Sequence, residues 1–249
     1  MKLGSYGSIR RWLAAAALLV ALSPLAALGG EAGPAQWRAD IAAFVAHDRR
    51  DPPPRHGVLF IGSSSIRFWA PTLARDFPGV PVIDRGFGGS TIADSTYYAD
   101  RIVAPYRPAL IVMYAGDNDI DNGLSPQRVA DDFRAFVARV RRDQPGVPVV
   151  YVSIKPSVAR WSEWPRMREA NRRIRAWAAT QREVRFVDIV PRMLDAQGKP
   201  RSELFRADGL HMTPAGYATW IDALKPVLAS YGFRTTQAAS ATPAASASK

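Results

Sequence analysis

The chain has 249 residues, of which 47% are hydrophobic and 22% are charged. This length suits one α/β domain with a substantial core, and the composition excludes a chain that is disordered throughout. Lys and Arg number 33 against 22 Asp and Glu, which raises the question of a nucleic-acid partner. The arginines are dispersed along amphipathic segments such as 134–142 and 166–175, without a basic stripe interleaved with aromatic residues. We therefore expect no nucleic-acid partner.

The first residues have the layout of a signal peptide. Lys2, Arg10 and Arg11 precede an uncharged apolar run from Trp12 to about Leu28. Because this run is shorter than the ~20 residues that a membrane-spanning helix needs, residues 1–29 are predicted to be a signal peptide. The protein is then periplasmic or secreted, with no stable membrane insertion after cleavage, and an uncleaved N-terminal anchor is the alternative. The chain contains no Cys, which excludes disulfides.

Residues 30–54 are predicted to form an N-terminal helix and a proline linker. Trp37, Ile41, Phe44 and Val45 recur at helical spacing, and a run of three prolines ends the segment. The linker leads into the main domain, which we expect to cover residues 55–234.

In that domain, strands and helices alternate. Five apolar runs are typical of buried strands: 58–61, 80–83, 110–114, 147–154 and 184–187. Thr213 followed by Pro214 is typical of the start of a last helix, which runs to about residue 231. Strands that are apolar along their whole length predict a parallel sheet covered on both faces, which is a three-layer α/β sandwich. The Ala/Ser-rich tail, residues 235–249, is expected to be disordered.

Histidine is the usual general base near neutral pH, and the chain has only three histidines. Ligands of parallel sheets bind beyond the carboxyl ends of the strands, and neither His47 nor His56 follows a strand. His211 lies in Asp208-Gly-Leu-His211, directly before the last helix. A carboxylate three residues earlier can orient the imidazole as in a catalytic triad. A loop carboxylate that caps a turn, with a surface histidine beside it, is the alternative.

Three serines follow the first strand, in Gly62-Ser-Ser-Ser65. A strand-to-helix turn exposes a hydroxyl at the edge of the sheet and directs the N–H groups of the helix N-terminus at an oxyanion. Serines that only cap the following helix are the alternative. The segment contains neither the Gly-x-Ser-x-Gly nucleophile elbow nor a phosphate-binding loop.

Two further loops could stabilise an oxyanion. The glycines of Gly86-Phe-Gly-Gly-Ser90, after the second strand, either let backbone N–H groups approach a ligand or form a flexible turn. Asn118, after the third strand, either donates a hydrogen bond to developing negative charge or serves the turn. The neighbouring aspartates could indicate a metal site, but the histidines that complete most transition-metal sites are missing, so we expect no metal.

Taken in order, these blocks resemble those of the SGNH hydrolases, also called the GDSL esterase/lipase family. Gly62-Ser63-Ser64 matches the family's Gly-Asp-Ser, which implies Ser64 as the nucleophile. Gly89 matches the glycine whose N–H lines the oxyanion hole, and Asn118 matches the third block, Gly-x-Asn-Asp. The last block, Asp-x-x-His, is matched by Asp208 and His211. The family's aspartate before the nucleophile is a serine here, which leaves Ser63 and Ser65 as alternative nucleophiles.

The resemblance, which spans residues 58–217, implies a flavodoxin-like three-layer fold, no metal, and esterase or deacetylase chemistry on lipids, sugars or small esters. Together with the predicted signal peptide, it leads us to expect an exported serine esterase without a cofactor. It implies a catalytic triad of Ser64, Asp208 and His211. It also implies an oxyanion hole formed by Ser64, Gly89 and Asn118. The loops after the first and fourth strands could border the pocket. Trp69, Lys155, Arg160 and Trp161 are therefore expected to bind the substrate, unless they pack helices or are solvated.

The expected substrates are small-molecule or carbohydrate esters with a short acyl or acetyl group. The aromatic side chains expected at the pocket suit a sugar or an acyl chain. A lipid esterase or lysophospholipase-like enzyme is the first alternative. A non-catalytic carbohydrate-binding relative that kept the fold is the second.

Overall fold

The computed structural model describes Met1 and residues 33–236. The predicted signal peptide apart from Met1, and residues 237–249 of the predicted tail, lie outside the described residues. Within residues 33–236, five parallel strands form one sheet in the order β2-β1-β3-β4-β5. Their bounds are β1 Val58–Gly62, β2 Val82–Gly86, β3 Leu110–Tyr114, β4 Val149–Val152 and β5 Val184–Val187.

The predicted parallel sheet is confirmed, with a small shift at the start of two strands. Strands β2 and β4 both begin two residues later than the apolar pattern predicts. Each is directly preceded by a proline, Pro81 and Pro148. Because proline has no N–H to donate to the ladder, the strand begins only after it.

Helices fill the connections between the strands. The longer helices are α1 Arg38–Arg50, α2 Ser64–Asp76, α6 Pro126–Asp143, α7 Trp164–Ala178 and α9 Pro214–Ser230. The shorter helices are α3 Ile92–Tyr97, α4 Ala99–Ile102, α5 Asp117–Asp121 and α8 Val190–Met193. Four 3-10 helices are η1 Gly33–Trp37, η2 Ala104–Tyr106, η3 Trp161–Glu163 and η4 Ser202–Leu204. Helix α9 begins as predicted, because the Thr213 side chain accepts a hydrogen bond from the N–H of Gly216.

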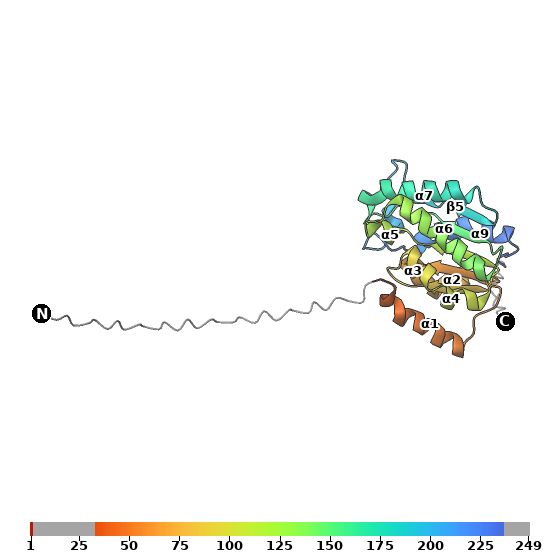
Figure 1. Cartoon of the computed structure of the whole chain (residues 1–249). Coiled ribbons are helices and arrows are strands. Elements are labelled where there is room, and N and C mark those ends of the chain that lie inside the picture. Colours follow the sequence, from red (N-terminus) through yellow and green to blue (C-terminus); the bar gives the residue numbers. More distant parts are fainter. Residues whose placement is uncertain (2–32, 237–249) are drawn as a thin grey trace, which may run out of the picture.

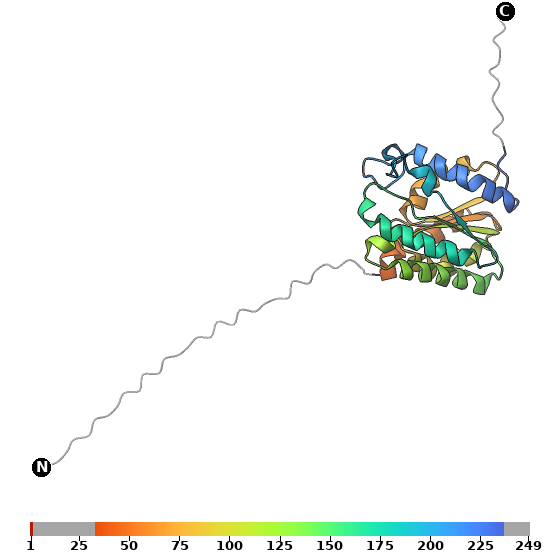
Figure 2. The same ribbon diagram turned by 90° about the horizontal axis from the view of Figure 1, so that it is seen from above.

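Each face of the sheet is covered by its own set of helices (Figures 1 and 2). Leu59 and Ile61 of β1 belong to one hydrophobic core, together with residues of α1, α6 and α7. Val58 and Phe60 belong to the other, with residues of α2 and α9. Successive side chains of a strand point to opposite faces, so a strand that is apolar at every position supplies both cores. The molecule is thus the three-layer sandwich that the sequence predicts.

The N-terminal helix packs on the main domain rather than standing apart from it. Ile41 of α1 is fully buried in the core shared with α6 and α7. The Asp48 carboxylate accepts two hydrogen bonds, at 2.6 and 2.7 Å, from the guanidinium of Arg85 in β2. Residues 33–50 are therefore held against the sheet by both apolar packing and a buried ion pair.

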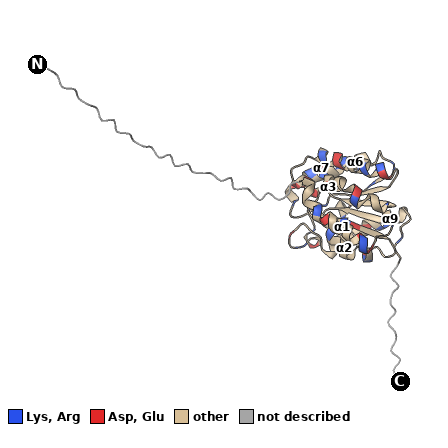
Figure 3. Ribbon diagram, turned by 60° about the horizontal axis from the view of Figure 1, so that its bottom comes forward, with Lys and Arg blue, Asp and Glu red and all other residues tan. Residues whose placement is uncertain are grey.

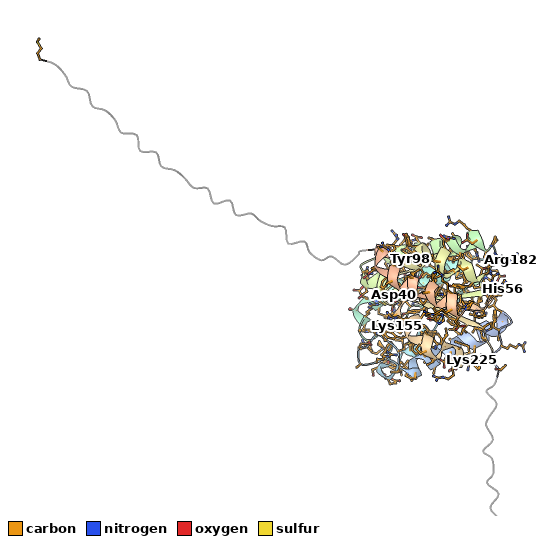
Figure 4. All side chains as sticks on the ribbon, turned by 90° about the horizontal axis from the view of Figure 1, so that it is seen from below. Asp40, His56, Tyr98, Lys155, Arg182 and Lys225 are labelled. Carbon is orange, nitrogen blue, oxygen red and sulfur yellow. The ribbon has the colours of Figure 1, made fainter. Side chains whose placement is uncertain are left out.

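The two ends of the sheet are distinct in Figure 4. Lys155, which follows β4, lies at one end of the molecule, whereas His56 and Arg182, which precede β1 and β5, lie at the other. The carboxyl ends of all five parallel strands consequently meet at the Lys155 end, where a ligand of this fold class binds.

Basic and acidic residues are interspersed along the helices (Figure 3). On α6, Arg139 pairs with Asp143, and on α7, Arg172 pairs with Glu169. The Arg172 side chain is exposed, which fits the expectation that the arginines occupy solvated helix faces, whereas that of Arg139 is only 12% exposed. Among residues 33–236, no helix is long and apolar enough to cross a membrane.

Candidate active site

The turn between β1 and α2 places three serines at the carboxyl end of β1, which lies between β2 and β3 in the sheet. Gly62 has φ of 141°, and a Cβ at this position would overlap the carbonyl oxygen of Tyr114 in β3. Only glycine fits here, because it tolerates this backbone conformation and the close approach of the neighbouring strand. The N–H of Ser63 then donates to the Tyr114 carbonyl at 3.1 Å, which fixes the start of α2.

The three serine hydroxyls have different surroundings. Ser63 and Ser65 are fully buried, whereas Ser64 is partly exposed. The Ser63 hydroxyl has no hydrogen-bond partner among the described residues, and the Ser65 hydroxyl lies 3.2 Å from the Lys155 ammonium. The Ser64 Oγ lies 3.0 Å from Nε2 of His211. Of the three, Ser64 is thus the serine that combines access to solvent with contact to a histidine.

His211 is oriented by Asp208 in the loop before α9. Its Nδ1 lies 2.7 Å from Oδ2 of Asp208, and its own backbone N–H and that of Leu210 both donate to Oδ1 of Asp208 at 2.9 Å. The carboxylate is held from two directions, so its second oxygen is aimed at the imidazole. With Nδ1–H donated to Asp208, Nε2 carries the lone pair that faces the Ser64 hydroxyl.

The same contacts determine the charge of Asp208. Partial desolvation acts to raise the pKa of Asp208, but the hydrogen bonds from the His211 side chain and from the backbone N–H groups of Leu210 and His211 outweigh it and lower the pKa to about 2. Asp208 is therefore a carboxylate throughout the range in which a histidine titrates, as a residue that orients an imidazole requires.

Phe68 lies beside the histidine on the side of α2. Its ring meets the His211 imidazole edge-on, with 4.6 Å between the ring centroids, and the guanidinium of Arg206 lies over the Phe68 ring. Phe68 and Ser64 are four residues apart on one helix and share a face. This helical spacing is the sequence signal that identifies Phe68, rather than Trp69, as the aromatic neighbour of the site.

Asn118 is placed at the next strand end by the short helix α5. Its side chain is almost entirely buried, and its Nδ2 donates to the carbonyl oxygen of Ser90 at 2.9 Å. Its Oδ1 accepts a hydrogen bond from Nη1 of Arg160, also at 2.9 Å. The amide thus bridges the loop after β2 and the loop after β4.

Gly89 lies in the loop after β2, and a residue from the N-terminal segment covers it. Gly89 has φ of 78°, and a Cβ at this position would lie 3.1 Å from the indole of Trp37, the last residue of η1. The Trp37 ring also packs edge-on against Phe87, with centroids 5.7 Å apart. No local sequence signal places Trp37 near the site, because this contact joins segments about fifty residues apart in the chain.

The expectation that Lys155 borders the substrate pocket is wrong. Its side chain is 1% exposed, and its ammonium contacts Asp117 at 2.7 Å, the Tyr114 hydroxyl at 2.9 Å and the Ser65 hydroxyl. Burial alone would raise the pKa of Asp117, but the nearby Lys155 and Arg160 charges hold it below its ordinary value. The ion pair contacts the turn between β1 and α2 through Ser65, so the buried Lys155 supports that turn instead of facing a pocket.

The expectation for Trp69 is also wrong. Trp69 is fully buried in the core under α2, and its indole N–H donates to Asp76 at 2.8 Å. At 100° per residue, position 69 is turned about 140° away from Ser64 on α2 and faces the sheet. Trp161 is partly buried and stacks on Trp164, with centroids 5.9 Å apart. Its role in substrate binding stays a prediction.

Arg160 and the aspartates near Asn118 form ion pairs with one another. Arg160 donates to Asp121 at 2.8 Å and lies 3.7 Å from Asp117. Asp119 accepts a hydrogen bond from the N–H of Ile92. No group of three or more His, Cys, Asp or Glu side chains that could hold a metal ion occurs within the part of the chain that the structure describes.

Comparison with known proteins places this arrangement in a family. The sequence model of the GDSL-like Lipase/Acylhydrolase family matches residues 56–219. The esterase TesA of Pseudomonas aeruginosa is 24% identical over 147 residues, which are 59% of this chain and 69% of TesA.

Solved structures share the fold. A GDSL-like lipase from Bacteroides thetaiotaomicron superposes with a TM-score of 0.66 at 21% identity, covering 77% of this chain and 98% of that one. A carbohydrate esterase family 3 protein from Talaromyces cellulolyticus superposes with a TM-score of 0.55 at 17% identity, covering 70% of this chain and 96% of that one. The match of the family's sequence model over most of the folded domain is decisive: the chain belongs to the GDSL-like lipase/acylhydrolase family and is an enzyme that hydrolyses esters.

Proposed function

We propose that this enzyme is an exported serine esterase in which Ser64 is the nucleophile, His211 its general base and Asp208 the residue that orients the base. The observation that carries the proposal is the continuous chain of contacts from Asp208 Oδ2 through His211 to Ser64 Oγ, at 2.7 and 3.0 Å. Nucleophile, base and orienting carboxylate at hydrogen-bond distance constitute the machinery of acyl transfer.

In the proposed reaction, Ser64 Oγ attacks the ester carbonyl carbon while its proton passes to Nε2 of His211. The resulting oxyanion lies against the N–H groups of Ser64 and Gly89 and the Asn118 side chain. Ser64 is the first residue of α2, so its N–H has no acceptor within the helix. When the tetrahedral intermediate collapses, the alcohol leaves with the proton from His211. Water, deprotonated by the same histidine, then attacks the acyl-enzyme and releases the acid.

The surroundings of Ser64 favour a short acyl group. Two exposed large apolar side chains lie near His211. Phe68 of α2, at 40% exposure, contacts the imidazole, and Val158 in the loop after β4, at 44%, lies beside Gly209. Two apolar side chains form only a small apolar contact area. An area of this size suits an acetyl or short acyl group, or the face of a sugar. The carbohydrate esterase with the same fold makes acetylated sugars natural substrates to test.

Covalent labelling with a fluorophosphonate probe tests the nucleophile. We expect the probe to label the unmodified mature enzyme and the variants Ser63→Ala and Ser65→Ala. Ser64→Ala should remain unlabelled, because the probe reacts with the activated serine. Labelling of Ser64→Ala would reject Ser64 as the nucleophile. Absence of labelling in every variant, with activity retained, would reject the serine mechanism altogether.

A series of p-nitrophenyl esters tests the acyl group. We expect kcat/KM to be greatest for acetate and to fall as the acyl chain lengthens. An optimum at eight or more carbons would instead support a lipid esterase. Export is tested separately by mass spectrometry of the protein from the periplasm and medium, where we expect an N-terminus near residue 30.

A further inference from the structure

Arg160 contacts the amide of Asn118 from the side opposite Ser90. Its side chain is 14% exposed, Nη1 donates to Asn118 Oδ1 at 2.9 Å, and Nη2 donates to Asp121 Oδ2 at 2.8 Å. Asn118 and Asp121 are both residues of α5 and lie three positions apart, on one side of this short helix. A single guanidinium therefore holds the asparagine and the helix that carries it.

This contact determines which end of the amide faces the proposed oxyanion. A guanidinium has only donors, so the Asn118 atom that it contacts must be the oxygen, and the NH₂ group must be turned the other way. One NH₂ hydrogen is donated to the Ser90 carbonyl oxygen. The second has no acceptor within residues 33–236 and remains for the substrate oxyanion.

We propose that Arg160 is a positioning residue for the oxyanion hole, acting through Asn118 rather than by contact with substrate. The inference rests on the proposed function, in which Asn118 donates to the oxyanion. The charge on Arg160 withdraws electron density from the amide through its oxygen, which strengthens the N–H donors at the other end. Preorganised donors contribute most to this kind of catalysis because they need no reorientation during the reaction.

The electrostatics of Arg160 argue against its binding an anionic substrate. Its guanidinium pairs with the carboxylate of Asp121 and lies 3.7 Å from that of Asp117. Two carboxylates around one cation leave little uncompensated charge for a ligand, and the small exposed fraction leaves little surface. The same charges hold Arg160 in place, so it presents a fixed donor to Asn118.

Steady-state kinetics on p-nitrophenyl acetate test the proposal with the full mature enzyme. We expect Arg160→Ala to lower kcat by about tenfold and to leave KM nearly unchanged. The loss is expected to be smaller than the 10²- to 10³-fold effect of removing an oxyanion donor, because Asn118 itself is still present. Arg160→Lys keeps a cation and one donor and should recover part of kcat. The matched control is Arg166→Ala: Arg166 donates to the carbonyl oxygens of Gly123 and Leu124, just after α5, without touching Asn118. Its kcat should equal that of the unmodified enzyme.

A double-mutant cycle separates a positioning role from a general structural one. If Arg160 acts through Asn118, Arg160→Ala should lower kcat in the unmodified enzyme but not in Asn118→Ala, with Ser64→Ala giving the background rate. An equal fold-loss in both backgrounds would overturn the proposal. So would a KM that rises in Arg160→Ala for a succinyl ester but not for the acetate, because Arg160 would then bind a substrate anion.

The proposed function can fail separately from this inference. If Asn118→Ala keeps the full kcat, Asn118 is not an oxyanion donor and the proposed oxyanion hole is wrong. If Asn118→Ala loses kcat as expected while Arg160→Ala does not, the oxyanion hole stands and the positioning role of Arg160 is rejected.

Discussion

Nε2 of His211 lies 3.0 Å from Oγ of Ser64, although 147 positions separate the two residues in the chain. Ser64 lies at the start of α2, directly after the inner strand β1, and His211 lies in the loop before α9. Helices α2 and α9 pack on the same face of the sheet, in the core that contains Trp69 and Trp220. The distance between Ser64 and His211 is therefore set by the packing of two helices.

Replacing Asp208 by asparagine should lower kcat by about 10³- to 10⁴-fold. The Asn oxygen can keep the hydrogen bonds from the N–H groups of Leu210 and His211. Its NH₂ group would then face Nδ1 of His211, which forces the imidazole proton onto Nε2 and removes the lone pair that accepts the Ser64 proton.

Kinetics with p-nitrophenyl acetate, together with a thermal melt, measure this effect. Asp195→Asn is the matched control, since Asp195 likewise accepts hydrogen bonds from backbone N–H groups two and four residues later but lies in another loop. A full kcat in Asp208→Asn would show that Asp208 does not orient the base.

Replacing Trp37 by alanine should lower kcat because the loop that carries Gly89 would lose the ring packed against it. Displacement of a catalytic group by about 1 Å can cost up to about 10²-fold in rate, so we expect a loss of about tenfold or more. Some stability should be lost as well, because the ring is partly buried.

Phe44→Ala is the control for the Trp37 prediction. Phe44 lies in α1 and packs against the same core and Arg85, but not against the glycine loop. It should lower the melting temperature and leave kcat unchanged. Equal kcat values for the two variants would show that the N-terminal segment contributes to stability alone.

Replacing Lys155 by methionine should destabilise the protein by about 3–5 kcal/mol, because it leaves the buried Asp117 carboxylate without its cation. The double variant Lys155→Met with Asp117→Asn should recover part of this loss, since no unpaired charge remains. Urea unfolding followed by circular dichroism measures both.

The matched control for the buried pair is Asp131→Asn. It breaks the Arg134–Asp131 pair, in which both side chains are more than 40% exposed, and should change the free energy of unfolding by less than about 1 kcal/mol. If Lys155→Met were as mild as this control, the buried pair would not support the turn between β1 and α2.

Stability should decrease as the pH rises through neutrality, with Asp119 as one cause. Burial raises the pKa of Asp119 to about 7, although the hydrogen bond from the Ile92 N–H acts to lower it. A carboxyl whose pKa is higher in the folded state than in the unfolded state binds its proton more tightly when folded. Its contribution to stability is therefore complete below the unfolded pKa of 3.8 and is lost as the pH rises through about 7.

Asp119→Asn should remove this part of the pH dependence, because the amide keeps an oxygen for the Ile92 N–H and does not ionise. We expect the free energy of unfolding to fall less steeply in the variant than in the unmodified protein between about pH 5 and pH 8. Comparing the two proteins cancels the contribution of Asp84, whose burial also raises its pKa to about 7. Parallel curves would contradict the prediction.

Much of the fold follows from local patterns in the sequence. Apolar runs of four to eight residues that alternate with amphipathic segments predict parallel strands covered on both faces, and each of the five strands overlaps one of those runs. The loop motifs likewise predict which residues gather at one end of the sheet, because the carboxyl ends of parallel strands meet there. On this basis the sequence predicts Ser64, Asn118, Asp208 and His211 as site residues, since the residue types that such chemistry needs are few and their order is distinctive.

The identity of the neighbours of that site required the tertiary structure. Trp69 and Lys155 lie in the expected loops, yet one faces the core and the other is buried in an ion pair. Trp37 lies outside the family's matched region and still covers Gly89. Arg160 faces Asn118 instead of the solvent. Periodicity and motifs report the local backbone and the residue types, whereas the contacts between distant segments depend on how the helices pack on the sheet. The sequence by itself thus determined the fold class and the catalytic residue types, and packing alone decided which side chains support them.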